Sequence, residues 1–343
     1  MSRIDLAYTR HTQGDLAGAE AIYRSMIGDG EDAIPAANNL YVLLRSERRW
    51  SDLAQLYRTL AAAIPANGDW AIHLATQLLR HEEYEAGWQW FEARRYVSRN
   101  AAVAPALSLP EWTGEPIRRL LVWREQGLGD EIQFARYVAP LAQRGIAVTL
   151  LCRPALARLF RHVQADVVPL AGSVNLPGPY DAWSLLGSLP LRLGSPYEIP
   201  APLHVSATPR AAGGVGVMTT GSATHGNDAN RSMPAKPAAR LLSLPGAVSL
   251  QPEDTGARDF QDTADIIAGL DCVVSVDTSV AHLAGSMGKP TFVLLPAVRP
   301  DWRWLRDRDD SPWYPSVRVL RQAQPGDWNG LIDRVAAEIA PAR

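Results

Sequence analysis

The chain has 343 residues, which is too long for one ordinary domain and suits two or three. Hydrophobic residues make up 47% of it, so wholesale disorder is excluded. The net charge of −2 gives no sign of nucleic-acid binding, and no apolar run reaches membrane-spanning length. Cys152 and Cys272 lie in apolar runs, as buried thiols of a reducing compartment do, and the N-terminus lacks a signal-peptide pattern. We therefore expect a cytoplasmic protein.

The first 97 residues contain a repeat of 34 residues. Two of its positions recur with apolar or aromatic side chains: Leu16, Trp50 and Tyr84 in one, and Tyr23, Tyr57 and Phe91 in the other. This period is typical of tetratricopeptide repeats, in which each helix pair buries its apolar face against the next pair. We expect an α-helical array of such repeats over residues 1–97, with an ordinary helical domain as the alternative.

Prolines mark residues 98–116 as a linker, after which short apolar runs alternate with helical patterns. Strands are expected at 119–123, 147–152, 166–170, 214–218, 248–250, 272–276 and 291–295, and helices at 131–144, 154–162, 235–244, 262–269, from 280, and at 327–339. Such alternation predicts parallel sheets. It favours two Rossmann-like lobes, 117–208 and 209–343, with a link near 200–209 and ligands at the carboxyl ends of the strands.

The turn after the first predicted strand carries Gln126, Gly127, Gly129 and Asp130. Two glycines let the backbone turn tightly and approach a ligand closely. Asp130 would then stand at a helix N-terminus that faces the cleft. On spacing alone a helix cap explains this aspartate better than catalysis does, because Asp is favoured at caps in any protein.

A second polar cluster follows the strand at 272–276 and contains Asp277, Thr278, Ser279 and His282. The helix that opens at Ser279 offers backbone N–H groups that suit a diphosphate. The alternative is a set of capping residues with a packed histidine. The convergence of several polar groups at one strand end favours a binding site.

Thr219 and Thr220 follow the first strand of the second lobe, and Arg231 lies just beyond them. Hydroxyls and a guanidinium are suitable phosphate ligands, although a solvated polar loop is the alternative. The aromatic segments 301–304 and 311–315 could stack on a sugar or a base, but a structural anchor explains them better.

Residues 120–325 resemble the GT-B domain of glycosyltransferase family 9, the heptosyltransferase-like family, in the bacterial branch that carries tetratricopeptide units. The resemblance rests on segments 125–137, 227–234, 249–251, 259–264, 276–290, 301–304 and 311–315. It implies an inverting, metal-independent transfer of a sugar from a nucleotide-activated donor, with no cofactor. Some members of this branch are implicated in glycosylating flagellin.

The resemblance also implies roles for single residues. Asp130 occupies the place of the general base in the first, acceptor-side lobe, and the second lobe would bind the donor through Thr219, Thr220, Arg231, Gln251, Asp277, Thr278, Ser279 and His282. We expect a protein acceptor, with a Ser or Thr hydroxyl, bound through the helical repeats. A transferase acting on lipopolysaccharide core and a non-catalytic repeat scaffold with a degenerate transferase domain remain as alternatives.

Overall fold

A computed structural model describes residues 2–63, 68–97, 107–172, 176–195, 197–210, 213–306 and 308–339. The chain divides into two compact units. One unit comprises Met1–Leu79 with Gln89–Ala101, and the other comprises Arg80–Trp88 with Ala102–Arg343.

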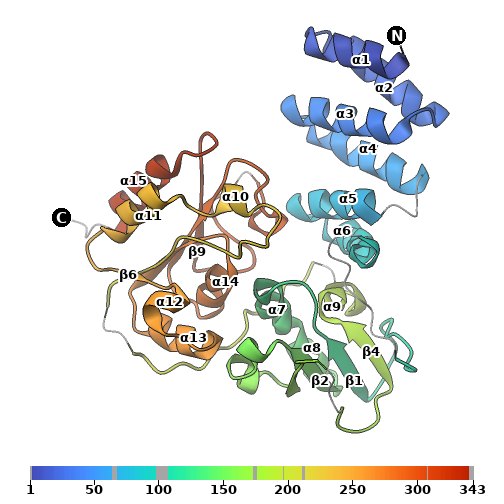
Figure 1. Cartoon of the computed structure of the whole chain (residues 1–343). Helices are drawn as coiled ribbons and strands as arrows, with labels where there is room; N and C mark the ends of the chain where they lie inside the picture. Colours follow the sequence, from blue (N-terminus) through green and yellow to red (C-terminus); the bar gives the residue numbers. More distant parts are fainter. Residues whose placement is uncertain are drawn as a thin grey trace. The chain divides into compact units, whose positions relative to one another are not determined.

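The first unit is helical. Its elements are α1 (Arg3–Thr12), α2 (Leu16–Asp29), α3 (Ala33–Ser46), α4 (Trp50–Ala63), α5 (Gly68–Arg80), the end of α6 (Tyr84–Phe91) and the 3-10 helix η1 (Glu92–Tyr96). Helices α1 to α4 pack one against the next (Figure 1). Ser2 caps α1 and Asp15 caps α2, each through a side-chain oxygen that accepts a backbone N–H.

The 34-residue spacing appears directly in the helix starts, because α2, α4 and α6 begin at Leu16, Trp50 and Tyr84. The second recurring position is buried at Tyr23, Tyr57 and Phe91. The expected helical array is thus present. Its assignment to the tetratricopeptide family stays a prediction.

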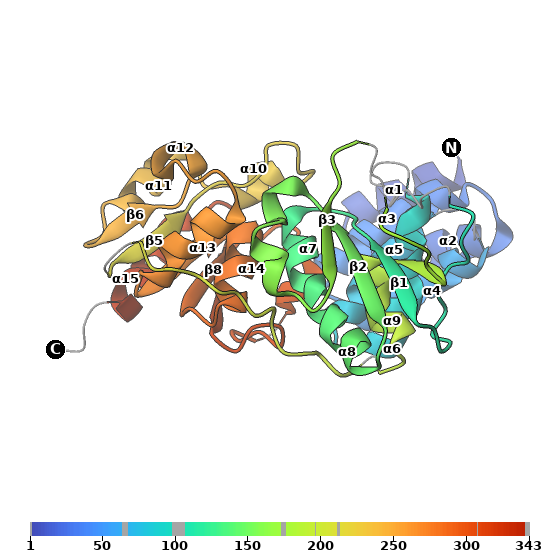
Figure 2. The same cartoon turned by 90° about the horizontal axis from the view of Figure 1, so that it is seen from below.

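The second unit contains two parallel sheets, each in its own lobe (Figures 1 and 2). The first lobe has strands β1 (Arg119–Trp123), β2 (Ala147–Cys152), β3 (Asp166–Pro169) and β4 (Ala182–Leu185), in the order β3-β2-β1-β4. Its helices are α7 (Leu128–Phe134), α8 (Val138–Gln143) and α9 (Leu189–Arg192), with 3-10 turns at Ala135–Tyr137, Pro154–Leu156, Leu159–His162 and Leu186–Ser188.

The second lobe has strands β5 (Val215–Met218), β6 (Ala247–Ser249), β7 (Cys272–Val276), β8 (Thr291–Leu295) and β9 (Val317–Arg321), in the order β6-β5-β7-β8-β9. Its helices are α10 (Asp228–Arg231), α11 (Ala235–Leu242), α12 (Pro252–Thr255), α13 (Phe260–Ala268), α14 (Ser279–Ser286), α15 (Trp328–Ile339) and the 3-10 turn η6 (Trp302–Trp304). Helices α11 and α15 pack on the sheet through Leu241, Leu331 and Val335. Two parallel sheets with covering helices fit the expected GT-B-like α/β fold.

Two helices expected in the first lobe need correction. The predicted helix at 131–144 is broken into α7, a 3-10 turn and α8, and the predicted helix at 154–162 is two 3-10 turns closed by i→i+3 bonds such as Ala157 N–H to Pro154 O. The described end of the predicted linker, 107–116, is an ordered part of the lobe. Trp112 N–H donates to Trp183 O at 2.8 Å, and Trp183 N–H donates to Pro110 O at 3.0 Å. The boundaries predicted between the domains stay predictions.

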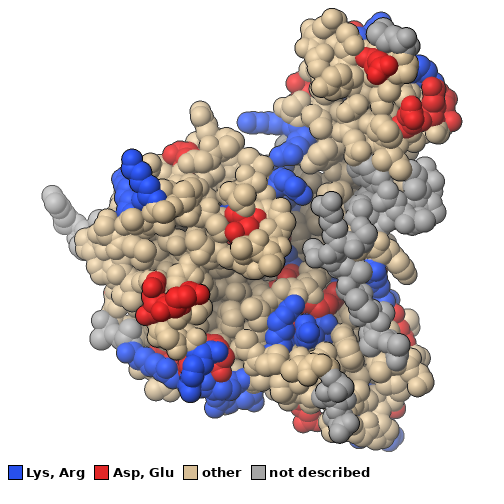
Figure 3. All heavy atoms as spheres, in the orientation of Figure 1, with Lys and Arg blue, Asp and Glu red and all other residues tan. Residues whose placement is uncertain are grey.

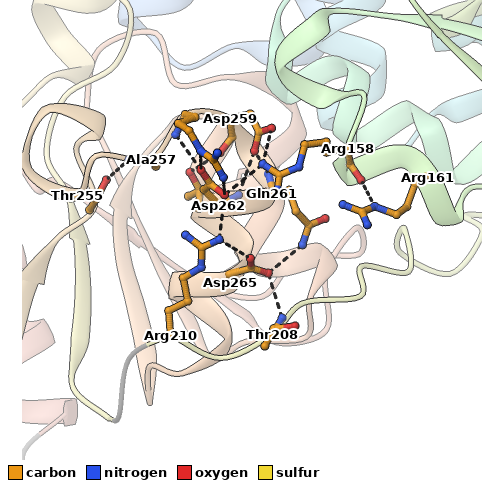
Figure 4. A network of polar contacts seen from close by, with 12 residues as sticks. Arg158, Arg161, Thr208, Arg210, Thr255, Ala257, Asp259, Gln261, Asp262 and Asp265 are labelled. Carbon is orange, nitrogen blue, oxygen red and sulfur yellow. Dashed lines mark hydrogen bonds and ion pairs between the residues drawn. The ribbon is translucent and has the colours of Figure 1, made fainter.

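An ion-pair network at α13 joins the two lobes (Figure 4). The buried carboxylate of Asp262 accepts from Arg158 of the first lobe at 3.2 Å, from Arg210 of the connecting segment at 3.0 Å and from Arg258 at 2.7 Å. Arg158 also donates to Asp259, the residue that caps α13. The network fixes the place where the chain passes from one lobe to the other.

Candidate active site between the two lobes

Strand order marks one place in each sheet where a ligand is expected. In the first lobe the chain reverses direction across the sheet between β1 and β4, and in the second it reverses between β5 and β7. Loops that leave the carboxyl ends of such neighbouring strands diverge and open a crevice. Asp130 follows β1, Thr219 and Thr220 follow β5, and Asp277 follows β7. The sequence-predicted residues therefore lie at the switch points of both sheets.

The turn that carries Asp130 is tightly built. Gln126 has a positive φ of 58°, a conformation that costs energy in a residue with a side chain. The Gly127 N–H donates to Asp130 Oδ2 at 2.8 Å, so the carboxylate caps the start of α7. Asp130 is therefore not the N-cap, which is Gly127, but the third residue of α7, whose Oδ2 accepts the N-cap N–H, and its second oxygen, Oδ1, contacts Arg303.

Buried ion pairs hold this turn in place. Glu131 is completely buried and accepts from the Arg153 backbone N–H at 2.9 Å, while its other oxygen pairs with the Arg153 guanidinium. The same guanidinium donates to the carbonyl of Gln126. Glu125, also buried, accepts the Gly187 N–H at 2.7 Å from the loop after β4. Contacts from the segments after β2 and β4 therefore hold the turn that carries Asp130.

In the second lobe, the N-terminus of α14 is formed by Asp277, Thr278 and Ser279. Thr278 caps the helix, since its Oγ1 accepts the Val280 N–H at 3.3 Å. The Val280 N–H expected to meet a diphosphate is thus already bonded within the protein. Arg231 lies beside this end and donates from Nη1 to Asp277 O at 2.9 Å. A guanidinium and a helix N-terminus next to each other are well suited to an anion.

Two more predicted residues meet one strand away. Gln251, which follows β6, donates from Nε2 to Thr220 Oγ1 at 2.5 Å. Thr219 is buried, and its carbonyl accepts the Met233 N–H at 2.8 Å. The structure thus brings Thr220 and Gln251 together, whereas Thr219 is buried.

His282 is an uncharged, packed histidine. Its ring stacks on Trp304 with 5.3 Å between ring centroids, and its Nδ1 is hydrogen-bonded to Tyr314 Oη at 2.9 Å. Burial lowers the pKa of His282 to about 3, and the nearby Arg303 adds to this decrease. At neutral pH this side chain can offer a hydrogen bond to a ligand but not a positive charge.

The two lobes meet where Gly129 faces α14. A Cβ atom added at Gly129 would lie 2.7 Å from His282 Cδ2 and 3.4 Å from the Cα of Ser279. Helices α7 and α14 pack directly against each other along this contact. The predicted glycine is therefore needed for close approach between the lobes. It brings the Asp130 turn beside the N-terminus of α14.

Four charged groups from both lobes form the centre of the site. The Arg303 guanidinium contacts Asp130 Oδ1 and donates to both oxygens of Asp301, at 3.0 and 3.2 Å. Burial raises the pKa of Asp130, while Arg303 and the Gly127 N–H oppose the rise. Burial, with the Asp301 carboxylate nearby, raises the pKa of Asp277 to about 6, although Trp304 Nε1 donates to that residue at 2.8 Å.

Arg303 was not identified as a site residue from the sequence. The sequence favours a structural anchor for segment 301–304, and Trp302, Trp304, Trp313 and Tyr314 are buried. The missed signal is an arginine placed between two tryptophans, because a guanidinium in such apolar surroundings needs a carboxylate partner. Within the described ranges, no group of three or more His, Cys, Asp or Glu side chains is arranged to hold a metal ion.

On the face shown in Figure 3, basic and acidic side chains of the second unit lie in several small groups, some of one sign and some mixed. No helix of the described residues combines the length and the apolar character that crossing a membrane requires.

No known protein-family profile matches the chain. FlbA of Caulobacter vibrioides is 26% identical to it over 325 residues, which are 77% of this chain and 54% of FlbA. The chain thus spans about half the length of this curated relative.

Solved structures similar to the chain include glycosyltransferases. TibC, a dodecameric iron-containing glycosyltransferase from enterotoxigenic E. coli, is 15% identical, covers 65% of this chain and 66% of its own, and superposes with a TM-score of 0.45. A family 9 glycosyltransferase of Veillonella parvula is 12% identical over 60% of this chain and 86% of its own, with a TM-score of 0.43. At these scores the fold assignment rests on the chain's own strand order.

Proposed function

We propose that this chain is a glycosyltransferase that moves a sugar from a nucleotide-activated donor to an acceptor hydroxyl. The observation that carries the proposal is the meeting of Asp130, at the switch point of one sheet, with the N-terminus of α14, at the switch point of the other. One side of this junction offers a carboxylate that can accept a proton. The other offers a helix N-terminus and the Arg231 guanidinium, which suit a diphosphate.

In the proposed reaction the Asp130 carboxylate takes the proton of the acceptor hydroxyl as its oxygen attacks the anomeric carbon. The bond from that carbon to the diphosphate oxygen breaks, and the diphosphate leaves with the electron pair. Because the displacement is direct, the configuration at the anomeric carbon is inverted. General-base assistance is typically worth ~10²–10⁴-fold in rate.

Charge on the leaving diphosphate would be stabilised by Arg231, by the N-terminus of α14 and by the hydroxyl and amide groups of Thr220 and Gln251. Fixed donors of this kind are worth about 3–4 kcal/mol each when they meet charge that develops in the transition state. This set supports a transfer that needs no metal ion. Turnover is expected to persist in excess EDTA, and its loss, restored by a divalent cation, would contradict that part of the proposal.

Donor binding is tested by a thermal-shift screen of the full chain against UDP, GDP, ADP, CMP and their common sugar conjugates. A ligand at ~100 times its Kd stabilises the folded state by about 2.7 kcal/mol. A shift that disappears in Arg231→Ala supports the assigned site. Arg240→Ala is the matched control, because Arg240 lies on the outside of α11, where it pairs with Asp333. No shift with any nucleotide would favour a non-catalytic scaffold.

We propose a Ser or Thr hydroxyl of a protein such as flagellin as the acceptor. The helical array in the same chain supports a protein acceptor, since stacked helix pairs form extended concave binding surfaces. Incubation with the donor found in the screen and with purified flagellin, followed by intact-mass measurement, tests this choice. Transfer to a lipopolysaccharide core acceptor with none to protein would contradict it.

A further inference from the structure

Arg303 is the point at which the second lobe reaches the proposed base of the first. It leaves the η6 turn after β8, and its side chain is only 7% exposed. Its Nη2 contacts Asp130 Oδ1 and its Nε contacts Gln133 Oε1, both on α7 of the first lobe. Its Nη1 is held by Asp301, which also caps η6. Two nitrogens of this guanidinium therefore bond to α7, and the third bonds to Asp301 at the start of η6.

The surroundings of this guanidinium are apolar and aromatic. Its central carbon lies 4.5 Å from the centre of the Trp302 ring and 5.6 Å from that of Phe134. Trp88 packs edge-on against both rings, at 5.7 Å from Trp302 and 6.0 Å from Phe134. Charges interact more strongly in such a setting than in water. The position of Arg303 is fixed by packing as well as by its carboxylate partners.

Both oxygens of Asp130 are held by groups that favour the ionised carboxylate. Oδ2 accepts the Gly127 N–H, and Oδ1 contacts Arg303. These two contacts, one from each lobe, fix the plane of the carboxylate. Each oxygen keeps a second lone pair with which it can accept a proton.

We propose that Arg303 is the positioning residue of this site, which keeps the Asp130 carboxylate ionised and oriented, so that the proton acceptor is complete only when both lobes are in place. This inference rests on the proposed function for its catalytic meaning. The effect of Arg303 on the charge state of the Asp130 carboxyl group does not depend on that function.

The charges around Asp130 give the inference a definite sign. Arg303 lowers the pKa of Asp130, whereas Asp301 and Glu125 raise it. The Asp130 carboxylate acts to raise the pKa of His225, in the loop after β5. Burial and Arg231 outweigh this effect and lower the pKa of His225. His282, on α14, carries no charge at neutral pH because its pKa is lowered to about 3. Removal of Arg303 leaves the half-buried Asp130 near like charges, which favours the protonated acid.

The experiment is a ¹³C NMR titration of the full-length chain labelled at the aspartate Cγ atoms. The Asp130 signal is the one missing in Asp130→Asn. In Arg303→Met we expect its midpoint about 1–3 pH units above that of the wild type, the usual effect of losing an adjacent opposite charge. Arg303→Lys, which keeps the charge but not the planar fork, should fall in between.

Arg308→Met is the matched control, because Arg308 pairs with Asp310 and Glu82 and does not contact Asp130. Its Asp130 midpoint should equal that of the wild type. Asp301→Asn should shift the Asp130 midpoint in the opposite direction. It removes a negative charge near Asp130 and leaves the Arg303 guanidinium with one carboxylate partner fewer. Its midpoint should fall, and it decides the matter if Arg303→Met does not fold.

A wild-type midpoint in Arg303→Met, or an unchanged or raised midpoint in Asp301→Asn, overturns the inference. The result is independent of the proposed function. A shifted midpoint in a protein that binds no nucleotide would leave the electrostatic role of Arg303 intact and remove the transferase assignment. An unshifted midpoint in an active transferase would remove the electrostatic role of Arg303 and leave the transferase assignment intact.

Discussion

The contact between Gly129 and His282 yields a prediction whose size follows from the structure. In Gly129→Ala the new Cβ would lie 2.7 Å from His282 Cδ2, well inside van der Waals contact. The imidazole cannot easily move away, because it is stacked on Trp304 and bonded to Tyr314. Forcing a methyl group into a packed site costs about 1–3 kcal/mol, while alanine is favoured over glycine in a helix by roughly 0.5–1 kcal/mol. We expect a net loss of stability of up to about 2.5 kcal/mol.

The assay is urea unfolding followed by tryptophan fluorescence, which reports the second unit through its buried Trp88, Trp302, Trp304 and Trp313. His282→Ala removes the obstructing ring, so in that background Gly129→Ala should become neutral or stabilising. The double-mutant cycle isolates this change of sign from the cost of His282→Ala itself. Equal destabilisation in both backgrounds would refute the reasoning, because the methyl group would then collide with something other than the histidine.

Three further predictions concern the same unit. Asp130→Asn should retain the nucleotide-induced thermal shift while turnover falls by ~10²-fold or more, measured as steady-state transfer, and wild-type turnover would remove Asp130 as the base. Arg258 and Arg158 hold the pKa of the buried Asp262 below its ordinary value, so its stabilisation is present above about pH 4 and is lost as the pH falls further. Asp262→Asn should therefore flatten the acid side of the stability curve, and an unchanged curve would contradict this. Thr278→Ala should lose about 1 kcal/mol of stability by removing the cap of α14, whereas Thr278→Ser, which keeps a capping hydroxyl, should lose less.

Local sequence patterns predict many of the helices and strands of this protein. The expected strands at 119–123, 147–152, 272–276 and 291–295 match β1, β2, β7 and β8 residue for residue. Each is an apolar run bounded by polar or turn residues, a pattern that does not depend on distant parts of the chain. The 34-residue repeat likewise fixed the starts of α2, α4 and α6, because each repeat is a local unit.

Strands β4 and β9 were missed, and each for a local reason. β4 is buried on both faces over four residues, so it shows no alternation that could separate it from a buried helical turn. β9 follows the aromatic segment 311–315, and the aromatic side chains of that segment favour an anchor over a strand in this region. Its place at the edge of the sheet is decided by pairing with β8, a contact that sequence patterns do not report.

The sequence by itself determined which polar residues stand at strand ends, and with them the two halves of the candidate site. Only the tertiary structure decided how those halves meet. Asp130 and Arg303 are 173 residues apart, and their contact depends on the placement of two separate sheets. The same holds for Gly129 and His282. Local propensity acts over a few residues, whereas a buried charge finds its partner through the packing of whole lobes, and so the partner of the proposed base became visible only in three dimensions.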